Sequence, residues 1–226
     1  MSALGHRLRL FGGFSPLSIA GLQFWIDSSD GSTFTYSSGV EVSQWNDKSG
    51  NARHVSQGTV GKQPSRNTTR NSLDTVAFTA ANGDELLSGA ISMTRPVTVF
   101  GVTRYSDINT SSHVIMRLGT LGSVYTNTGN FKMWSGLSIN AGADDALWHY
   151  FTWVFNGASS SIRKNGSLAV SGNTGANTTA IDIVVGSDLG VSYWDGDIAE
   201  ILIYNSVLGT IDRDNVEAYL ASKWGF

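Results

Sequence analysis

Short apolar or alternating segments recur along almost the whole chain, and this pattern constrains the fold most. They lie at residues 21–27, 40–45, 75–79, 97–104, 113–119, 123–127, 131–136, 148–155, 161–170, 180–186 and 197–204. Clusters of Gly, Asn, Ser, Thr and Asp separate them, as turns separate β-strands. Many short strands without alternating helices predict an all-β sandwich or barrel.

One dipeptide marks a hairpin. Asn165 and Gly166 stand between "SIRK" and "SLAV", and both residue types tolerate positive φ. The pattern therefore predicts a two-residue type I′ turn at this position.

One helix is expected, at residues 210–225. Its apolar side chains recur at three- and four-residue spacing and form one face: Val216, Tyr219, Leu220 and Trp224. Thr210 or Asp212 is the expected N-cap, and Gly225 is expected to end the helix.

Composition excludes several classes of function. The 226 residues include no cysteine, so disulfides, zinc-thiolate sites and cysteine nucleophiles are absent. Charged residues are only 15% and the net charge is −3, which gives no general attraction to nucleic acid or to acidic membranes. No window approaches the roughly 18 apolar residues of a membrane helix. The N-terminal segment lacks the uninterrupted apolar stretch of a signal peptide, so we do not expect secretion through it.

The domain organisation is predicted to be an extended N-terminal arm, residues 1–20, followed by one domain, residues 21–226. The arm combines basic Arg7 and Arg9 with apolar Phe11 and Phe14. A segment of this kind is costly to leave in water, so we expect it to dock on a partner subunit.

Several segments, in their order, resemble a known family. "GLQFWIDSSDGSTF", "VSQWNDKSGNARHVSQ", "LWHYFTWVFNGASSSIRKNGSLAVSG" and "GDIAEILIYNSVL" resemble the laminin-G-like domains of the concanavalin A-like lectin/glucanase superfamily. The resemblance implies a jelly-roll sandwich of two packed antiparallel sheets with a short C-terminal helix.

Single-domain chains with a short arm ahead of "PLSIAGLQFW" also resemble products of tailed-bacteriophage genomes. That resemblance implies a non-enzymatic virion protein, assembled in the host cytoplasm, that decorates or cements a capsid or sits on the tail. Its expected partners are the major capsid protein or another virion protein, and further copies of itself. The alternative is a carbohydrate-binding module for host-surface glycans, with a glycoside hydrolase as a third interpretation.

The carboxylates of "WDGDIAEILIY" decide between enzyme and non-enzyme interpretations. Retaining glucanases need two carboxylates on one face of a strand. Asp195 and Asp197 share a face by alternation, whereas Glu200 is expected on the opposite face unless a β-bulge intervenes. We therefore interpret the three as the polar end of a strand and assign no catalytic residue.

The aromatic residues beside turns supply the candidate glycan contacts. Trp134, Tyr193 and Trp194 border turns, and a ring exposed beside Asp195 could stack on a sugar; edge packing is the interpretation that composition favours for these rings. The other tryptophans lie within strong apolar patterns, which predicts core or sheet-surface positions.

No metal site is assigned. The four histidines do not fall at metal-ligand spacings. Calcium is the one cofactor left open, at loop carboxylates such as Asp27, Asp30 and Asp47.

Overall fold

The protein is an antiparallel β-sandwich with one C-terminal α-helix, α2. The structure is a computed structural model that describes residues 13–106 and 111–226. The strands of the first sheet are β5 (Ser65–Arg70), β6 (Leu73–Phe78), β1 (Leu22–Asp27), β19 (Gly196–Tyr204), β9 (Val97–Tyr105), β14 (Trp148–Phe155), β15 (Ser160–Lys164) and β16 (Ser167–Gly172). The predicted fold class, an all-β two-sheet sandwich with a C-terminal helix, is confirmed.

The second sheet faces the first. Its strands are β2 (Phe34–Ser38), β3 (Glu41–Trp45), β4 (Val55–Ser56), β7 (Leu86–Ser88), β18 (Val184–Val185), β10 (His113–Leu118), β11 (Gly122–Asn127), β12 (Asn130–Trp134) and β13 (Ser138–Ala143). The sheets join where Glu41 of β3 pairs with Ser65 of β5, and β13 packs beside β16. A separate ribbon pairs β8 (Met93–Thr94) with β17 (Thr179–Ala180).

The main core fills the space between the sheets, and a second apolar cluster lies outside the first sheet. Along β9, Val97 and Val99 point into the main core, while Phe100 and Val102 point into the second cluster. Because both faces of β9 are covered, its sequence is an almost continuous apolar run.

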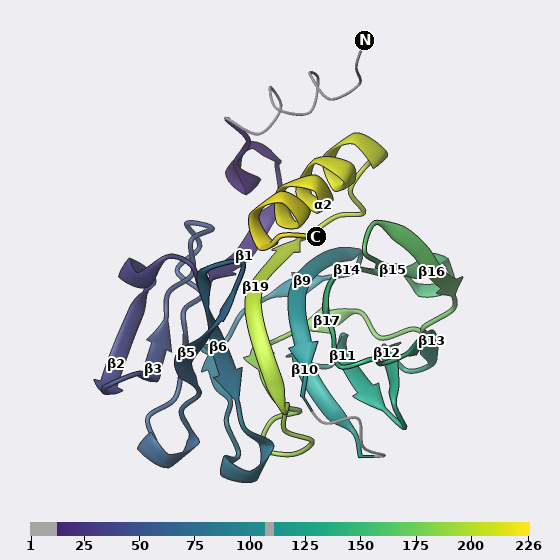
Figure 1. Cartoon of the computed structure of the whole chain (residues 1–226). Helices are drawn as coiled ribbons and strands as arrows, with labels where there is room; N and C mark the ends of the chain where they lie inside the picture. Colours follow the sequence, from purple (N-terminus) through teal and green to yellow (C-terminus); the bar gives the residue numbers. More distant parts are fainter. Residues whose placement is uncertain (1–12, 107–110) are drawn as a thin grey trace.

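Helix α2 (Thr210–Trp224) covers the outer face of the first sheet. Val216, Leu220 and Trp224 are buried against this sheet, which confirms the predicted apolar face. Figure 1 shows the helix lying across the ends of β1 and β19, with β11, β12 and β13 on a different side of the molecule. Gly225 ends the helix in the left-handed conformation, as predicted. The predicted N-cap is wrong: Gly209 occupies that position and no side chain caps the first turn.

The predicted hairpin is confirmed. Asn165 and Gly166 have φ of 50° and 77° and join β15 to β16 as a two-residue turn. The apolar segment 180–186 is less regular than expected, because only its ends pair, in β17 and β18. Strands β2, β5 and β13 lie outside the predicted segments, since they are polar and none of their residues is fully buried.

The chain ahead of β1 contacts the domain from Phe14 onward. The Phe14 ring lies 5.8 Å from the ring of Tyr219 on α2, and Ile19 is buried in the second cluster. The Tyr204 hydroxyl donates to the carbonyl oxygen of Pro16 at 3.1 Å. Residues 14–19 of the predicted arm therefore lie on the domain.

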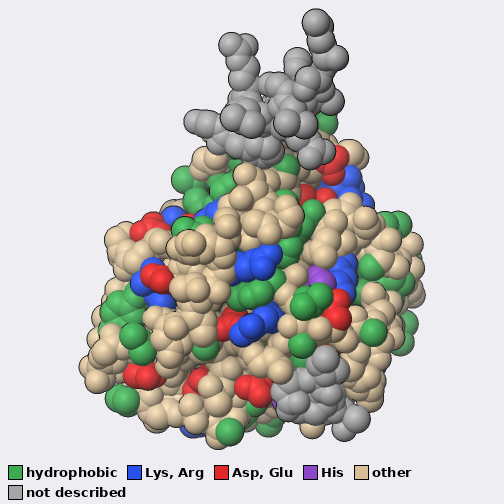
Figure 2. All heavy atoms as spheres, viewed as in Figure 1, with side chains coloured by type: hydrophobic (Ala, Val, Ile, Leu, Met, Phe, Trp, Pro, Cys, Tyr) green, Lys and Arg blue, Asp and Glu red, His purple; other side chains and the backbone are tan. Residues whose placement is uncertain are grey.

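The surface seen in Figure 2 has acidic and basic side chains side by side, with apolar side chains scattered between them. Within residues 13–106 and 111–226, no helix has the length and apolar character needed to cross a membrane.

Candidate functional site

The three carboxylates near the start of β19 do not alternate as predicted. The pairing of β19 with β9 places Asp197 opposite Arg104 and Glu200 opposite Val102, with an irregularity between Ile198 and Glu200. This bulge turns Glu200 to the same outer face as Asp197, so its predicted opposite orientation is wrong.

Glu200 is nonetheless covered, because α2 lies on that face. Its side chain is 0% exposed. The indole nitrogen of Trp25 and the hydroxyl of Tyr219 donate to Oε1 at 2.8 and 2.9 Å. The ammonium of Lys223 and the indole nitrogen of Trp224 donate to Oε2, both at 2.8 Å. Four donors saturate this carboxylate, which leaves no access for a sugar or a water nucleophile.

Lys223 also joins Glu200 to its cross-strand partner. Its ammonium lies 2.6 Å from Asp27 Oδ1, and Asp27 pairs with Glu200 between β1 and β19. Burial raises the pKa of Glu200 despite the neighbouring Lys223. Burial also disfavours ionised Asp27, but Lys223, Ser29 and Lys48 together hold the pKa of Asp27 below its ordinary value. The cluster fastens α2 to the sheet.

Asp197 and Asp195 are engaged differently. Asp197 is buried and accepts hydrogen bonds from Arg104 Nε at 2.9 Å and from the Thr68 hydroxyl at 2.7 Å. Asp195 is half-buried, and its Oδ1 lies 3.5 Å from the amide nitrogen of Ala80.

The carboxylates considered for calcium are bonded to protein donors. Lys48 lies 2.9 Å from both Asp27 and Asp30, and Asp47 accepts from the amide of Trp25 and from Ser49. In the described part of the chain, no three His, Cys, Asp or Glu side chains are grouped to hold a metal ion.

The predicted glycan contacts separate in the structure. Trp194 is 0% exposed and packs on the ring of Tyr105 at 5.0 Å, so its prediction as an exposed contact is wrong. Residues 186–194 fold back on themselves beside β10, and the amide of Trp194 donates to the carbonyl of Gly186 at 2.7 Å. Tyr193 is half-buried near Gly83. Only Trp134 presents a largely open ring, at 39% exposure.

Trp134 stands on the outer face of the second sheet, which no helix of residues 13–106 and 111–226 covers. Side chains on β11 alternate between buried and half-buried, because one face packs on the core and the other is open. Two rows of cross-strand neighbours lie on this outer face. The rows are Arg117, Ser123, Trp134 and Ser138, and Val114, Tyr125, Lys132 and Asn140.

A hollow of about 210 Å³ opens beside Trp134, and we call it the Trp134 hollow. It is lined by Ser112, Val114, Ser123, Tyr125, Trp134, Asp188 and Ser192. The Tyr125 hydroxyl lies 2.8 Å from the Ser138 hydroxyl. Asp188 is held by Arg117, whose Nε lies 3.1 Å from Oδ1, while the Asp188 side chain remains 47% exposed. Two aromatic rings, serine hydroxyls and an oriented carboxylate therefore converge on one surface.

Sequence reasoning missed Tyr125 and Asp188. Tyr125 is the cross-strand neighbour of Lys132, two residues from Trp134, so the alternation of β11 and β12 was a signal for it. Asp188 is brought to the hollow by the loop before β19, and no local pattern marks it.

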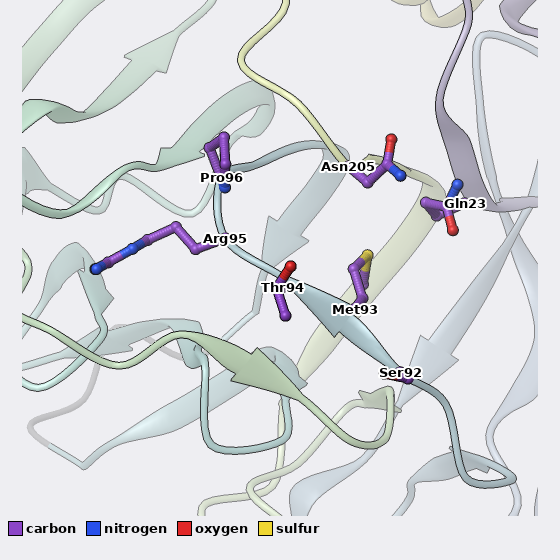
Figure 3. Close-up of a pocket in the computed structure, with 7 residues that line it drawn as sticks. All are labelled: Gln23, Ser92, Met93, Thr94, Arg95, Pro96 and Asn205. Atoms are coloured by element: carbon purple, nitrogen blue, oxygen red, sulfur yellow. The ribbon is translucent and has the colours of Figure 1, made fainter.

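The described residues form hollows elsewhere as well. Figure 3 shows the first, of about 260 Å³, lined by Gln23, Ser92, Met93, Thr94, Arg95, Pro96 and Asn205. Its lining is mainly polar and includes no aromatic ring. The Arg95 side chain extends away from Gln23 and Asn205 in this view, towards a second hollow at the loops of β12–β13 and β14–β15.

The predicted docking arm is not tested. Arg7, Arg9 and Phe11 lie outside the described residues, and Phe14 rests on Tyr219. The virion location, the capsid partner and the homo-oligomer therefore stay predictions.

Comparisons with known proteins establish the fold but do not assign the chain to a family. No family model and no curated protein matches the chain. Among solved structures, domain 4 of AbnA, an extracellular GH43 arabinanase from Geobacillus stearothermophilus in complex with arabinotriose, matches with a TM-score of 0.59 and 12% identity. The match covers 88% of this chain and 97% of that domain.

Two other solved structures are matched over only part of their length. The ligand-binding domain of botulinum neurotoxin serotype D, in complex with N-acetylneuraminic acid, has a TM-score of 0.58 and 15% identity, with 90% and 52% of the chains covered. Trypanosoma rangeli sialidase has a TM-score of 0.60 and 12% identity, with 96% and 36% covered. The chain thus spans about half of the toxin domain and a third of the sialidase. At these identities the likeness establishes the sandwich fold alone.

Proposed function

We propose that this protein is a carbohydrate-binding, lectin-like domain whose site is the Trp134 hollow. The observation that carries the proposal is the exposed Trp134 ring beside Tyr125, on a sheet face that no helix of the described residues covers. Two sandwich domains of similar fold are complexed with sugars, arabinotriose and N-acetylneuraminic acid. These neighbours favour the carbohydrate-binding interpretation over the virion one.

The chemistry of the hollow suits a sugar. The apolar face of a pyranose or furanose ring can stack on Trp134, because an aromatic ring supplies flat apolar area with little loss of rotamer freedom. Ring hydroxyls can then donate to Asp188 and exchange hydrogen bonds with Ser123 and Ser192. Arg117 fixes the Asp188 carboxylate before the ligand arrives, which lowers the ordering cost of binding.

The test is glycan binding by wild type and by Trp134→Ala, measured by calorimetry against a panel of oligosaccharides. We expect the variant to lose about tenfold or more in affinity, since truncating an aromatic anchor at the centre of a binding site costs about 2 kcal/mol or more. Tyr36→Ala is the matched control, because Tyr36 is an aromatic residue of similar exposure, 37%, on distant strand β2. Equal affinity of wild type and Trp134→Ala would exclude this site.

We also propose that the protein is not a glycosidase. The burial and four hydrogen bonds of Glu200 support this, because a nucleophile or acid needs contact with substrate. Asp195→Asn combined with Glu200→Gln should leave glycan binding unchanged and alter only stability. Hydrolysis of β-glucans by the wild type that disappears in this double variant would contradict the proposal.

A further inference from the structure

The second hollow, of about 630 Å³, lies at the loop end of the sandwich, and we call it the Arg95 hollow. The turn between β12 and β13 supplies Gly136 and Leu137, and the turn between β14 and β15 supplies Gly157. The loop after β16 supplies Asn173 and Asn177. Because Gly136 follows Trp134 by two residues, the two hollows flank the same turn.

Arg95 gives this hollow its charge. Of the described residues that line it, Arg95 alone is ionisable. Its Nη1 donates to the carbonyl of Gly175 at 2.7 Å, which fixes the guanidinium while its other N–H groups have no partner in the described part of the chain. The ion pairs of the described residues engage other arginines and not Arg95. A half-buried guanidinium with free N–H groups has the geometry to receive a carboxylate.

The surroundings of Arg95 fit a small polar ligand with an apolar face. Gly157 lies beside the guanidinium with φ of 60°, and a Cβ there would lie only 3.2 Å from Nη1. Asn173 and Asn177 present amides, and Leu137 is 54% exposed at the rim. Amides and backbone groups can bond to sugar hydroxyls, while Leu137 can contact the apolar side of a ring.

We propose that the Arg95 hollow is a subsite for the carboxylate of an acidic sugar, so that the ligand class of this protein is an acidic oligosaccharide. This inference rests on the proposed function, in which Trp134 holds a neighbouring sugar of the same chain. The planar guanidinium receives the carboxylate through the N–H groups that Gly175 leaves free. The Trp134 hollow supplies stacking, and the Arg95 hollow supplies selection by charge.

The experiment compares two matched pairs of probes on the full chain: trigalacturonic acid with its carboxyl-reduced form, and sialyllactose with lactose. We expect at least one acidic member to bind about tenfold or more tightly than its neutral counterpart, because charge-assisted hydrogen bonds are worth about that factor or more. The two pairs distinguish a uronic acid from a sialic acid. The preference should shrink in high salt.

Arg95→Gln should lower the affinity for the acidic member to that of the neutral one and leave the neutral affinity unchanged. Arg95→Lys keeps a charge and should retain part of the preference, which separates loss of charge from disturbance of the Gly175 loop. Lys62→Gln is the control, since it removes one exposed charge from another loop, after β4. It should keep the full preference.

Equal binding of both members of each pair by the wild type would overturn the inference, as would a preference that survives Arg95→Gln. The proposed function fails separately. Trp134→Ala should weaken the binding of acidic and neutral members alike. If it weakens the binding of neither, while Arg95→Gln abolishes the preference for the acidic member, the Arg95 subsite is supported and the Trp134 site is excluded. Binding of none of the four probes would overturn both.

Discussion

Trp224, the last residue of α2, packs at 0% exposure against the outer face of the first sheet and donates to a buried carboxylate, whereas Trp134 on the outer face of the second sheet is 39% exposed. The residue type is the same in both cases. The difference is that α2 packs on the outer face of the first sheet and not on that of the second. Under α2, the polar groups of the first sheet bond to one another in a closed network that stabilises the fold. On the outer face of the second sheet, which we call the bare face, aromatic rings and carboxylates remain available to a ligand.

The largest expected effect concerns the closed network. Lys223→Met should lower the free energy of unfolding by about 3–5 kcal/mol, because it leaves Glu200 without its cation and removes one of the two ammonium groups that pair with Asp27. Urea unfolding measures the change. Lys164→Met is the control, since its pair with Asp145 is at the surface, at 3.4 Å, and should be worth only about 0–1 kcal/mol. Equal losses would mean that the network contributes no more than a surface pair.

The hairpin turn should respond next most strongly. Gly166→Val places a β-branched residue at φ 77°, with its Cβ 2.8 Å from the Tyr150 hydroxyl, and we expect a loss of about 1–3 kcal/mol. The turn is joined to the covered face, because Arg163 bonds both to the Gly166 carbonyl and to Glu217 of α2. Gly58→Val, at an open position, should unfold with the wild type in thermal melts. A wild-type melting temperature for Gly166→Val would refute the strained turn.

A second buried carboxyl lacks the compensation that Glu200 has. Asp84 is 2% exposed, its Oδ1 has no hydrogen-bond partner in the described chain, and burial raises its pKa to about 6. The folded protein therefore holds this proton more tightly than the unfolded chain, so Asp84 destabilises the fold as the pH rises from about 4 to about 6. Above that range the penalty is complete.

Asp84→Asn should therefore gain stability relative to the wild type across this window, by roughly 1 kcal/mol once solvent screening is allowed for. Unfolding in urea at pH 4, 5, 6 and 7 measures the difference, and groups that titrate alike in both proteins cancel. A constant difference between the two proteins over the whole range would show that Asp84 is not the titrating group.

The smallest expected effect on stability belongs to the bare face. Trp134→Ala should change the free energy of unfolding by no more than about 0.5 kcal/mol, while Trp224→Ala should cost about 3–5 kcal/mol. Denaturant unfolding of both variants gives the contrast directly. A large loss of unfolding free energy in Trp134→Ala would mean that its ring stabilises the sheet. The bare face would then not differ from the covered face in this respect.

The sequence by itself determined the class of fold and several local features. Continuous apolar runs at β9 and β19 and alternation at β11 follow from which faces are covered, and the Asn165-Gly166 turn needs only local backbone preferences. The face of α2 also follows from spacing alone. Polar strands such as β5 gave no such signal, because pairing with β6 rather than burial makes them strands.

Tertiary structure alone decided which polar and aromatic residues are available. A single bulge before Glu200 placed it under α2, and the fold of residues 186–194 buried Trp194 while bringing Asp188 to Trp134. Arg95 lines its hollow because loops that are far apart in the chain meet there. Local sequence fixes whether a side chain alternates inward or outward, but exposure depends on what another part of the chain lays over it, and that is a property of the packed molecule.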